Sequence, residues 1–232
     1  MDFESLIQLD KTLLLALNGS HSLFLDGLAQ VLTTAATWIP LYVSLLYLVI
    51  KNNENVQQIM LVVAGAAACV VLAGTVDDVL VKPWVARWRP THDPEIGALI
   101  DVVNGYRGGN YGFFSAHAAN TFSIAVFFCC VVRSKLLGAT LVLWSLVNCW
   151  TRIYLGVHYP GDIFFGLLWG GFVGGGLSWL YFWLRRRLFG APRYISTQFS
   201  SSGYQFSDVD VVLTVLAFTL VYAVVKAYLF LS

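Results

Sequence analysis

The sequence predicts an all-α integral-membrane protein: a polytopic bundle of about six transmembrane helices with an N-terminal interfacial helix. Hydrophobic residues make up 58% of the 232 positions and charged residues only 12%, whereas about a quarter of a soluble domain is charged. The apolar residues are gathered into six segments, each near the ~20 residues that a transmembrane helix requires. No remaining stretch resembles a soluble domain, so residues 1–232 are expected to form a single membrane domain.

The six expected spans are residues 23–50, 56–80, 113–132, 136–156, 163–184 and 208–231. The first is long and contains Pro40, which predicts either a kink or a division into two shorter helices. The fifth carries Gly166, Gly170 and Gly174, a spacing that lets helix backbones approach closely in lipid. The polar, serine-rich residues 191–206 are expected to form a flexible connection.

The first 17 residues are too few and too charged to span a bilayer. Leucines recur there at helical spacing and mark one face: Leu6, Leu9, Leu13, Leu14 and Leu17. This pattern predicts an amphipathic helix lying in the membrane interface. The acidic opening Met-Asp-Phe-Glu lacks the positive region that begins a signal peptide, so no cleavage is expected.

The charges of the loops predict how the bundle is oriented. One set of loops holds most of the basic residues that have no evident chemical role: Lys51, Arg133, Lys135, Arg185, Arg186, Arg187 and Arg193. Cytoplasmic loops are enriched in Lys and Arg, so these loops are expected in the cytoplasm. The opposite loops and both termini would then face the outer side of the cytoplasmic (inner) membrane.

Composition also excludes several classes of partner. The formal net charge is +1, which does not suggest a nucleic-acid-binding surface. The four cysteines fall within apolar segments and form neither a disulfide framework nor a metal-ligand spacing. We therefore expect no metal and no other cofactor, and the oligomeric state is left open.

Three motifs with polar and charged residues lie beside the expected spans, where ionisable groups are costly and often functional. The motif that comes last in the chain contains Arg152, His158 and Asp162. Tyr-Pro-Gly separates the histidine from the aspartate and interrupts any helix, so Asp162 is expected at the N-cap of the next helix. A carboxylate that receives one imidazole N–H leaves the other nitrogen free to act as a nucleophile. A histidine at the membrane interface beside a capping aspartate is the alternative.

The middle motif is expected to begin a helix. Ser115 follows a glycine-rich loop and is a natural N-cap. The backbone N–H groups of Ala116 and His117 would then point at any anion bound there. His117 is also placed to act as a general acid toward a leaving oxygen, although taken alone this common motif is better explained by simple capping.

The motif that comes first in the chain supplies cations. Lys82 and Arg89 are seven residues apart, and they offer a point charge and a planar fork for phosphate oxygens. Contact with lipid headgroups is the alternative explanation. Asp78 precedes Lys82 by four residues and would pair with it if the helix continues.

Taken together, in this order and spacing, the motifs resemble those of the type-2 phosphatidic acid phosphatase superfamily. The family pattern is Lys-x6-Arg-Pro, then Pro-Ser-Gly-His, then Ser-Arg-x5-His-x3-Asp. It is matched by Lys82, Arg89, Pro90, Ser115, His117, Arg152, His158 and Asp162. Three positions differ, with Phe114 for Pro, Ala116 for Gly and Thr151 for Ser. The resemblance covers about residues 75–180.

The resemblance implies a metal-independent membrane lipid phosphatase that works through a phosphohistidine intermediate. His158 would attack phosphorus, Asp162 would orient it, and His117 would protonate the leaving oxygen. The phosphate oxygens would be held by Lys82, Arg89, Ser115, Ala116 and Arg152.

The substrate is expected to be a membrane lipid phosphate, and the sequence leaves several open: a lipid A phosphate, undecaprenyl diphosphate or phosphatidylglycerol phosphate. Two other functions also remain open at this point. One is a phosphotransferase that passes the phosphoryl group to an acceptor other than water, and the other is a non-catalytic lipid-binding membrane protein.

Overall fold

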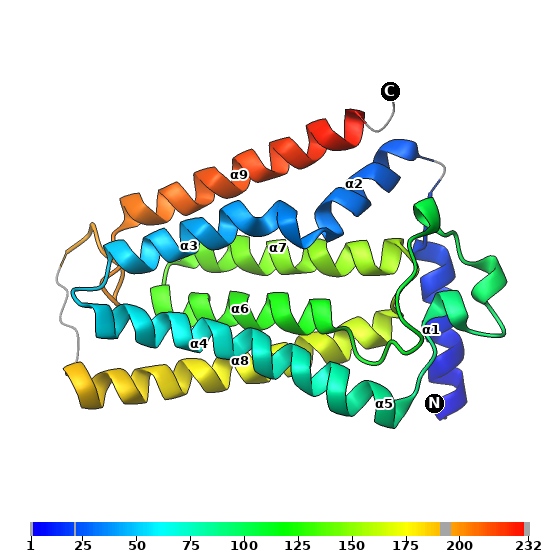
Figure 1. Cartoon of the computed structure of the whole chain (residues 1–232), viewed down its shortest axis with the longest axis horizontal. Coiled ribbons are helices and arrows are strands. Elements are labelled where there is room, and N and C mark those ends of the chain that lie inside the picture. Colours follow the sequence, from blue (N-terminus) through cyan, green and yellow to red (C-terminus); the bar gives the residue numbers. More distant parts are fainter. Residues whose placement is uncertain (1, 21, 191–195, 230–232) are drawn as a thin grey trace.

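A computed structural model describes residues 2–20, 22–190 and 196–229 of the chain. Within these residues the protein is helical, with no β-structure beyond two isolated bridges. Figure 1 shows long helices lying side by side as a bundle, with α1 (Phe3–Leu17) across one end. The predicted all-α bundle is confirmed.

Short connections join most neighbouring helices of the bundle, and longer ones join α5 to α6 and α8 to α9. They are α2 (Leu23–Thr33), α3 (Ile39–Lys51), α4 (Val56–Thr75), α5 (Lys82–Val85), α6 (Ala116–Val132), α7 (Lys135–Tyr154), α8 (Pro160–Phe189) and α9 (Phe206–Leu229). Two short segments link neighbours, the 3-10 turn η1 (Ala35–Trp38) and the π-helical turn η2 (Val76–Val81). The long loop after α5 contains three further 3-10 turns, Pro90–His92, Gly97–Leu99 and Val103–Gly105.

Length and hydropathy identify four helices able to cross a membrane: Val56–Val85, α7, α8 and α9. The pair formed by α2 and Ala35–Lys51 adds a fifth span if it is counted as one broken helix, bent by 69°. Helix α6 is apolar but has only 17 residues. The described residues thus give four to five spans by this criterion, and the predicted total of six is not confirmed.

The first span is divided, but not at its proline. The break falls at Thr34, which is extended (φ −76°, ψ 121°). Pro40 lies in the first turn of α3, where a missing N–H costs no helical hydrogen bond. Carbonyl groups freed by the break are satisfied by side chains, because Thr37 Oγ1 donates to Val31 O (2.6 Å) and Trp38 Nε1 donates to Leu32 O (2.8 Å).

Both ends of the described chain lie at the same end of the bundle. In Figure 1, α1, the tip of α9 and the long loop after α5 are at the right, and the α3–α4, α6–α7 and α8–α9 connections are at the left. The sequence motifs are all at the right-hand end. The basic loops are at the left, apart from Arg193, which lies outside the described residues.

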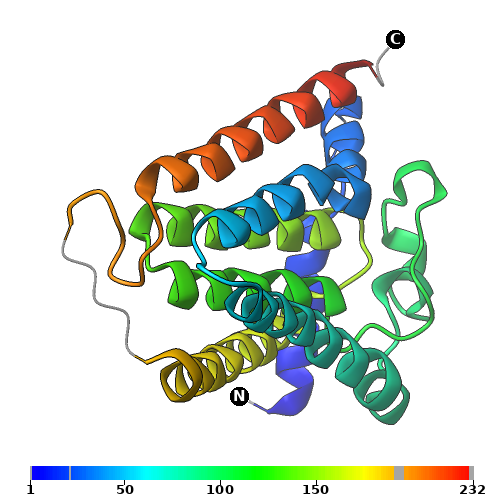
Figure 2. The same ribbon diagram turned by 60° about the vertical axis from the view of Figure 1, so that its left-hand side comes forward.

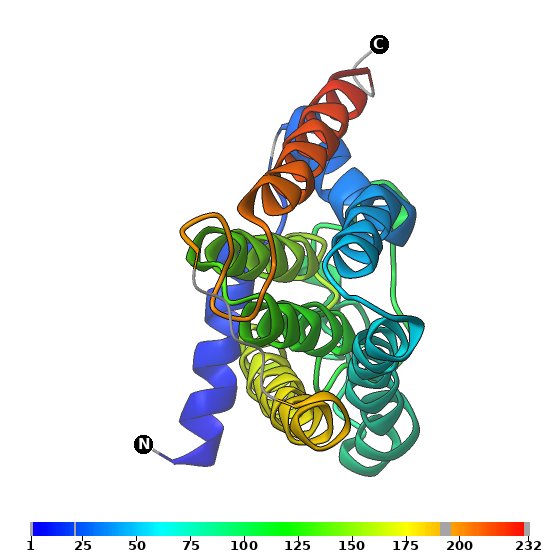
Figure 3. The same cartoon turned by 90° about the vertical axis from the view of Figure 1, so that its left-hand side faces the viewer.

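The centre of the bundle is α6. The views in Figures 2 and 3 show it surrounded by α4, α7 and α8. A Cβ added at Gly166, Gly170 or Gly174 would lie 2.7, 2.5 and 2.5 Å from backbone oxygens of α6 or its N-cap. These glycines bring the backbone of α8 directly against α6, which confirms the predicted close packing.

The connection before α9 is more ordered than expected. Ser200, Ser202 and Tyr204 are buried. Ser202 Oγ donates to Val132 O (2.8 Å), and the backbone N–H of Gln205 donates to Asn52 Oδ1 (2.7 Å). The prediction of a flexible connection is therefore wrong for residues 196–205, because its serines bind the end of the bundle; residues 191–195 lie outside the described part.

Candidate active site

The three sequence motifs converge where α5 ends, α6 begins and α7 turns into α8. Their point of convergence is His158, in the turn between α7 and α8, whose side chain is almost completely buried. Burial lowers the pKa of this imidazole well below its usual value, and the charges of Arg89, Arg152 and Lys82 lower it further. The ring is therefore held neutral, the form in which a nitrogen lone pair is available.

The neighbours of His158 define which nitrogen carries its proton. Nη1 of Arg89 lies 3.0 Å from Nε2. A guanidinium can only donate, so Nε2 accepts and the proton of the neutral ring is on Nδ1. Nδ1 faces Oδ2 of Asp162 at 3.6 Å, which is longer than a hydrogen bond.

Asp162 lies in the first turn of α8 and is completely buried. The expected N-cap position is wrong: the helix begins at Pro160, whose ring suits a first helical position, so Tyr159 is the N-cap. Asp162 instead reaches back from the third helical position, where its Oδ2 accepts the N–H of Tyr159 (3.0 Å). Its Oδ1 accepts from Nη1 of Arg87 (2.8 Å).

The middle motif begins α6 as predicted. Ser115 is the N-cap, and its Oγ accepts the N–H of Ala118 at 3.4 Å. The N–H of Ser115 donates to the backbone oxygen of Asp162 (3.1 Å), which joins the starts of α6 and α8. Helix geometry leaves the N–H groups of Ala116 and His117 without intrahelical partners. The His117 ring lies in the first turn of α6 and is partly buried.

Lys82 is held by two carboxylates. Its Nζ lies 2.5 Å from Oδ1 of Asp78, the predicted pair, and 2.7 Å from Oδ2 of the fully buried Asp77. The second contact follows from the π-helical turn, in which residues five apart face each other. A phosphate bound by Lys82 would therefore share it with these carboxylates.

The two arginines of the motifs, Arg89 and Arg152, are both buried and both held by neutral groups. Arg89 donates from Nε to Tyr111 O (3.0 Å) and from Nη1 to Val157 O (3.2 Å). Arg152 donates from Nη1 to Thr33 Oγ1 (2.5 Å) and to the hydroxyl of Tyr106 (2.9 Å). Neither forms an ion pair within the described residues, so both charges are available to an anion.

Several neighbours of the site were not predicted from the sequence. They are Asp10, Thr33, Asp77, Arg87 as a bridge between carboxylates, and Tyr106. Arg107, a further basic residue of the long loop, donates from Nη1 to Thr91 O at 3.3 Å. Among the described residues there is no cluster of three His, Cys, Asp or Glu side chains that could hold a metal ion.

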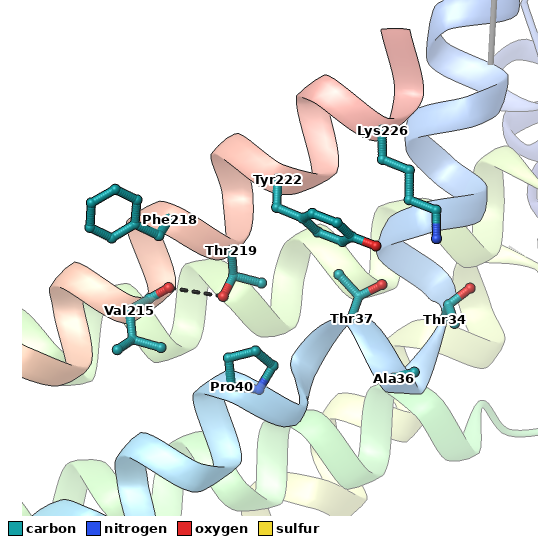
Figure 4. A pocket seen from close by; sticks show the side chains of 9 residues that line it. All are labelled: Thr34, Ala36, Thr37, Pro40, Val215, Phe218, Thr219, Tyr222 and Lys226. Carbon is teal, nitrogen blue, oxygen red and sulfur yellow. Dashed lines mark hydrogen bonds between the residues drawn. The ribbon is translucent and has the colours of Figure 1, made fainter. Parts of the chain in front are cut away.

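A cavity of about 440 Å³ lies away from this site, between α9 and the break in the first span (Figure 4). It is lined by Thr34, Ala36, Thr37, Pro40, Val215, Phe218, Thr219, Tyr222 and Lys226. None of the motif residues contributes to it. The broken helix separates the two regions, since Thr33 contacts Arg152 and the next residue, Thr34, lines the cavity.

The long apolar helices make the chain a multi-pass membrane protein. The model of the PAP2 superfamily matches residues 58–187, more than half of the sequence. The chain belongs to this superfamily, and the resemblance of its motifs is confirmed.

Three relatives illustrate what the chain is similar to. A lipid A 4′-phosphatase of Bacteroides thetaiotaomicron is 41% identical over 187 residues, 80% of each protein. A lipid A 4′-phosphatase of Porphyromonas gingivalis is 32% identical over 190 residues, 81% of this chain and 79% of the relative. A decaprenylphosphoryl-5-phosphoribose phosphatase of Mycobacterium tuberculosis is 38% identical over 112 residues, 48% of this chain and 56% of the relative. No solved structure matches the chain.

The family and these relatives make the protein a membrane lipid phosphatase, a hydrolase. The predicted enzyme class is confirmed, and the non-catalytic alternative is set aside.

Proposed function

We propose that the protein hydrolyses the 4′-phosphate of lipid A through a phosphohistidine intermediate. The choice of substrate is supported by the two lipid A 4′-phosphatases that align with about four fifths of the chain. The mechanism is supported above all by one observation, the buried neutral His158 between Arg89 and Asp162.

In the first step, Nε2 of His158 attacks the phosphorus atom. A P–N bond forms as the bond from phosphorus to the 4′-oxygen breaks. His117, which takes up a proton when the anionic phosphate binds beside it, gives that proton to the leaving oxygen. The proton on Nδ1 stays with the ring, and the carboxylate of Asp162 stabilises the positive charge that develops there.

In the second step, His117 accepts a proton from water while the water oxygen attacks phosphorus. The P–N bond breaks, inorganic phosphate leaves and His158 returns to its neutral form. His117 is then protonated again and ready for another cycle.

The transferred phosphoryl group carries its charge on oxygens that cations and N–H groups can bind. Arg89 is adjacent to the attacking nitrogen and would exchange its hydrogen bond with Nε2 for one with a phosphate oxygen. Arg152, Lys82 and the N-terminus of α6, with Ser115 and Ala116, would complete the binding of the other oxygens.

The membrane location fits a lipid whose phosphate lies at headgroup depth. The motif end of the bundle is opposite the basic loops, and the positive-inside rule therefore supports a catalytic face on the outer side of the cytoplasmic membrane. Lipid A in the outer leaflet would present its phosphate at that level.

The test uses purified protein, lipid A that carries phosphates at both ends of its disaccharide, and EDTA. Mass spectrometry of the product and release of inorganic phosphate should show loss of the 4′-phosphate alone. Undecaprenyl diphosphate and phosphatidylglycerol phosphate are assayed in parallel at equal surface concentration. A higher kcat/KM for either of these would overturn the lipid A assignment, and transfer of phosphate to another lipid without its release would overturn hydrolysis.

A further inference from the structure

Helix α1 lies across the motif end of the bundle and outside the region matched by the superfamily model (Figure 1). Its leucines Leu6, Leu9, Leu13 and Leu17 are exposed. The side chains of Asp10 and Lys11 are instead only 13% and 11% exposed. Charged side chains of an interfacial helix usually face water, so two that are turned inward need an explanation.

Asp10 contacts the α8 side of the site through both of its oxygens. Oδ1 accepts the backbone N–H of Gly161 (2.7 Å), and Oδ2 accepts from Nη2 of Arg87 (2.7 Å). The other branch of the same guanidinium, Nη1, donates to Oδ1 of Asp162 (2.8 Å). Arg87 therefore bridges a carboxylate of α1 and the carboxylate that faces His158.

We infer that Asp10 is a positioning residue for His158, acting through Arg87 and Asp162. The inference rests on the proposed function, because it takes His158 as the nucleophile. Asp10 itself contacts neither His158 nor, in the proposed mechanism, the substrate.

The physical reason lies in how arginine binds carboxylates. An unrestrained guanidinium favours a bidentate pair, with two nitrogens on the two oxygens of one carboxylate. Asp10 occupies Nη2 and so limits Arg87 to one oxygen of Asp162. The other oxygen, Oδ2, is left facing Nδ1 of His158. Without Asp10, Arg87 would compete with the imidazole for Oδ2.

The local sequence of α8 makes this approach possible. A Cβ added to Gly161 would lie 2.7 Å from Oδ2 of Asp10. Glycine at this position thus leaves room for the carboxylate to reach both the N–H of residue 161 and Arg87. The substitution Gly161→Ala would displace Asp10 without removing any charge.

A neighbouring contact of α1 provides the control. Lys11 binds Oε2 of Glu95 (2.7 Å) and Oδ2 of Asp93 (3.2 Å), and so ties α1 to the long loop. If Asp10 only fastens α1 to the bundle, losing Lys11 should have a similar effect. If Asp10 positions Asp162, the two losses should differ.

The experiment compares wild type, Asp10→Ala, Asp10→Asn, Gly161→Ala and Lys11→Gln in the same lipid nanodiscs. Readouts are kcat and KM on lipid A, thermal unfolding, and the ¹⁵N and ¹H resonances of the Nδ1–H group of His158. Asp10→Ala, Asp10→Asn and Gly161→Ala should lower kcat at least tenfold, leave KM within twofold, and shift the Nδ1–H proton upfield as its electrostatic interaction with Oδ2 of Asp162, 3.6 Å away, weakens. Lys11→Gln should keep kcat within twofold and leave the resonance in place.

Two results would overturn the positioning role. One is an unchanged kcat and Nδ1–H resonance in folded Asp10→Asn and Gly161→Ala variants. The other is an equal loss in Lys11→Gln, which would make α1 docking the cause. The resonance is recorded without substrate, so it stays informative if lipid A is the wrong lipid. Turnover by His158→Ala would instead refute the proposed function itself.

Discussion

Arg89 and His158 are joined by a hydrogen bond from Nη1 to Nε2, 3.0 Å long. The bond covers the nitrogen that is expected to attack phosphorus, and it fixes the ring proton on the side of Asp162. Arg89 thus binds the lone pair of Nε2 in the free protein. When a phosphate bonds to Nε2, Arg89 lies beside that phosphate.

Replacement of the proposed nucleophile should abolish turnover. His158→Ala should release no phosphate above background in a protein that unfolds at the wild-type temperature, since no other side chain can supply Nε2. Asp162→Asn should retain folding and lose roughly 10²–10⁴-fold in kcat, as when a carboxylate that orients a catalytic histidine is neutralised. Turnover by His158→Ala above a few per cent of wild type would contradict covalent catalysis at this residue.

The ring of His158 should stay neutral well into the acid range. Burial, then Arg89 and Arg152, lower its pKa below the usual 6.5, so it binds its second proton only at lower pH. In protein with ¹⁵N-labelled histidine, the signal that disappears in His158→Gln should keep the shifts of a neutral imidazole at pH 6. A half-protonated ring near pH 6.5 would show that His158 is more hydrated, or less affected by the neighbouring positive charges, than the structure indicates.

Activity should persist in excess chelator and be inhibited by vanadate. The site offers cations and imidazoles around the expected phosphate position, and vanadate can take the trigonal bipyramidal geometry of the transferring group. Phosphate release is measured with and without EDTA after dialysis. An EDTA-inactivated enzyme that recovers with magnesium or zinc would rule out the metal-independent mechanism.

Arg152 should not be replaceable by lysine. Its Nη1 donates to both Thr33 and Tyr106, and these bonds fix the guanidinium. The other N–H groups of the guanidinium remain available to phosphate. A lysine has no fork, so Arg152→Lys should lower kcat/KM by roughly 10²-fold, the scale of one lost transition-state donor. Tyr106→Phe is the matched control: it removes one hydrogen bond to the same group and should cost about tenfold or less. Equal losses of kcat/KM in the two variants would mean that the position of the positive charge matters and the planar shape of the guanidinium does not.

The catalytic end should be accessible from outside the cytoplasm. In a variant with its four cysteines replaced, Gly109→Cys should react with a membrane-impermeant thiol reagent in intact spheroplasts, because this loop position has open space around it. Ser201→Cys, exposed at the opposite end, should react only after the membrane is opened. The reverse pattern would redirect the search for substrates to lipids of the inner leaflet.

Much of the fold could be predicted from local sequence. Apolar length and the spacing of Gly166, Gly170 and Gly174 were enough to predict the helices and the close contact of α8 with α6. The errors arose at helix ends and in the connection before α9, where Ser202 and Gln205 bind the end of the bundle. Pro40 suggested a break but fits the first turn of α3, and Pro160 began α8 two residues before Asp162.

The candidate site was predicted less completely, because its supporting contacts are distant in sequence or depend on local helix geometry. Asp10 lies in what reads as an ordinary amphipathic helix, and its partner Arg87 is 77 residues away. Asp77 faces Lys82 only because a π-helical turn changes the helical register. The motif residues could be found because their order and spacing are those of a family.

The glycine contacts of α8 have a consequence for how this enzyme can change over evolution. The backbones of α6 and α8 are in direct contact, and the N-terminal ends of these helices carry Ser115 and Asp162. Moving α6 away from α8 to admit a bulkier lipid headgroup would therefore separate these two residues of the site. Room must come from those parts of α1 and of the long loop after α5 that carry no residue of the site. New substrate preferences should therefore be acquired by changes at those positions, with the α6–α8 contact inherited unchanged.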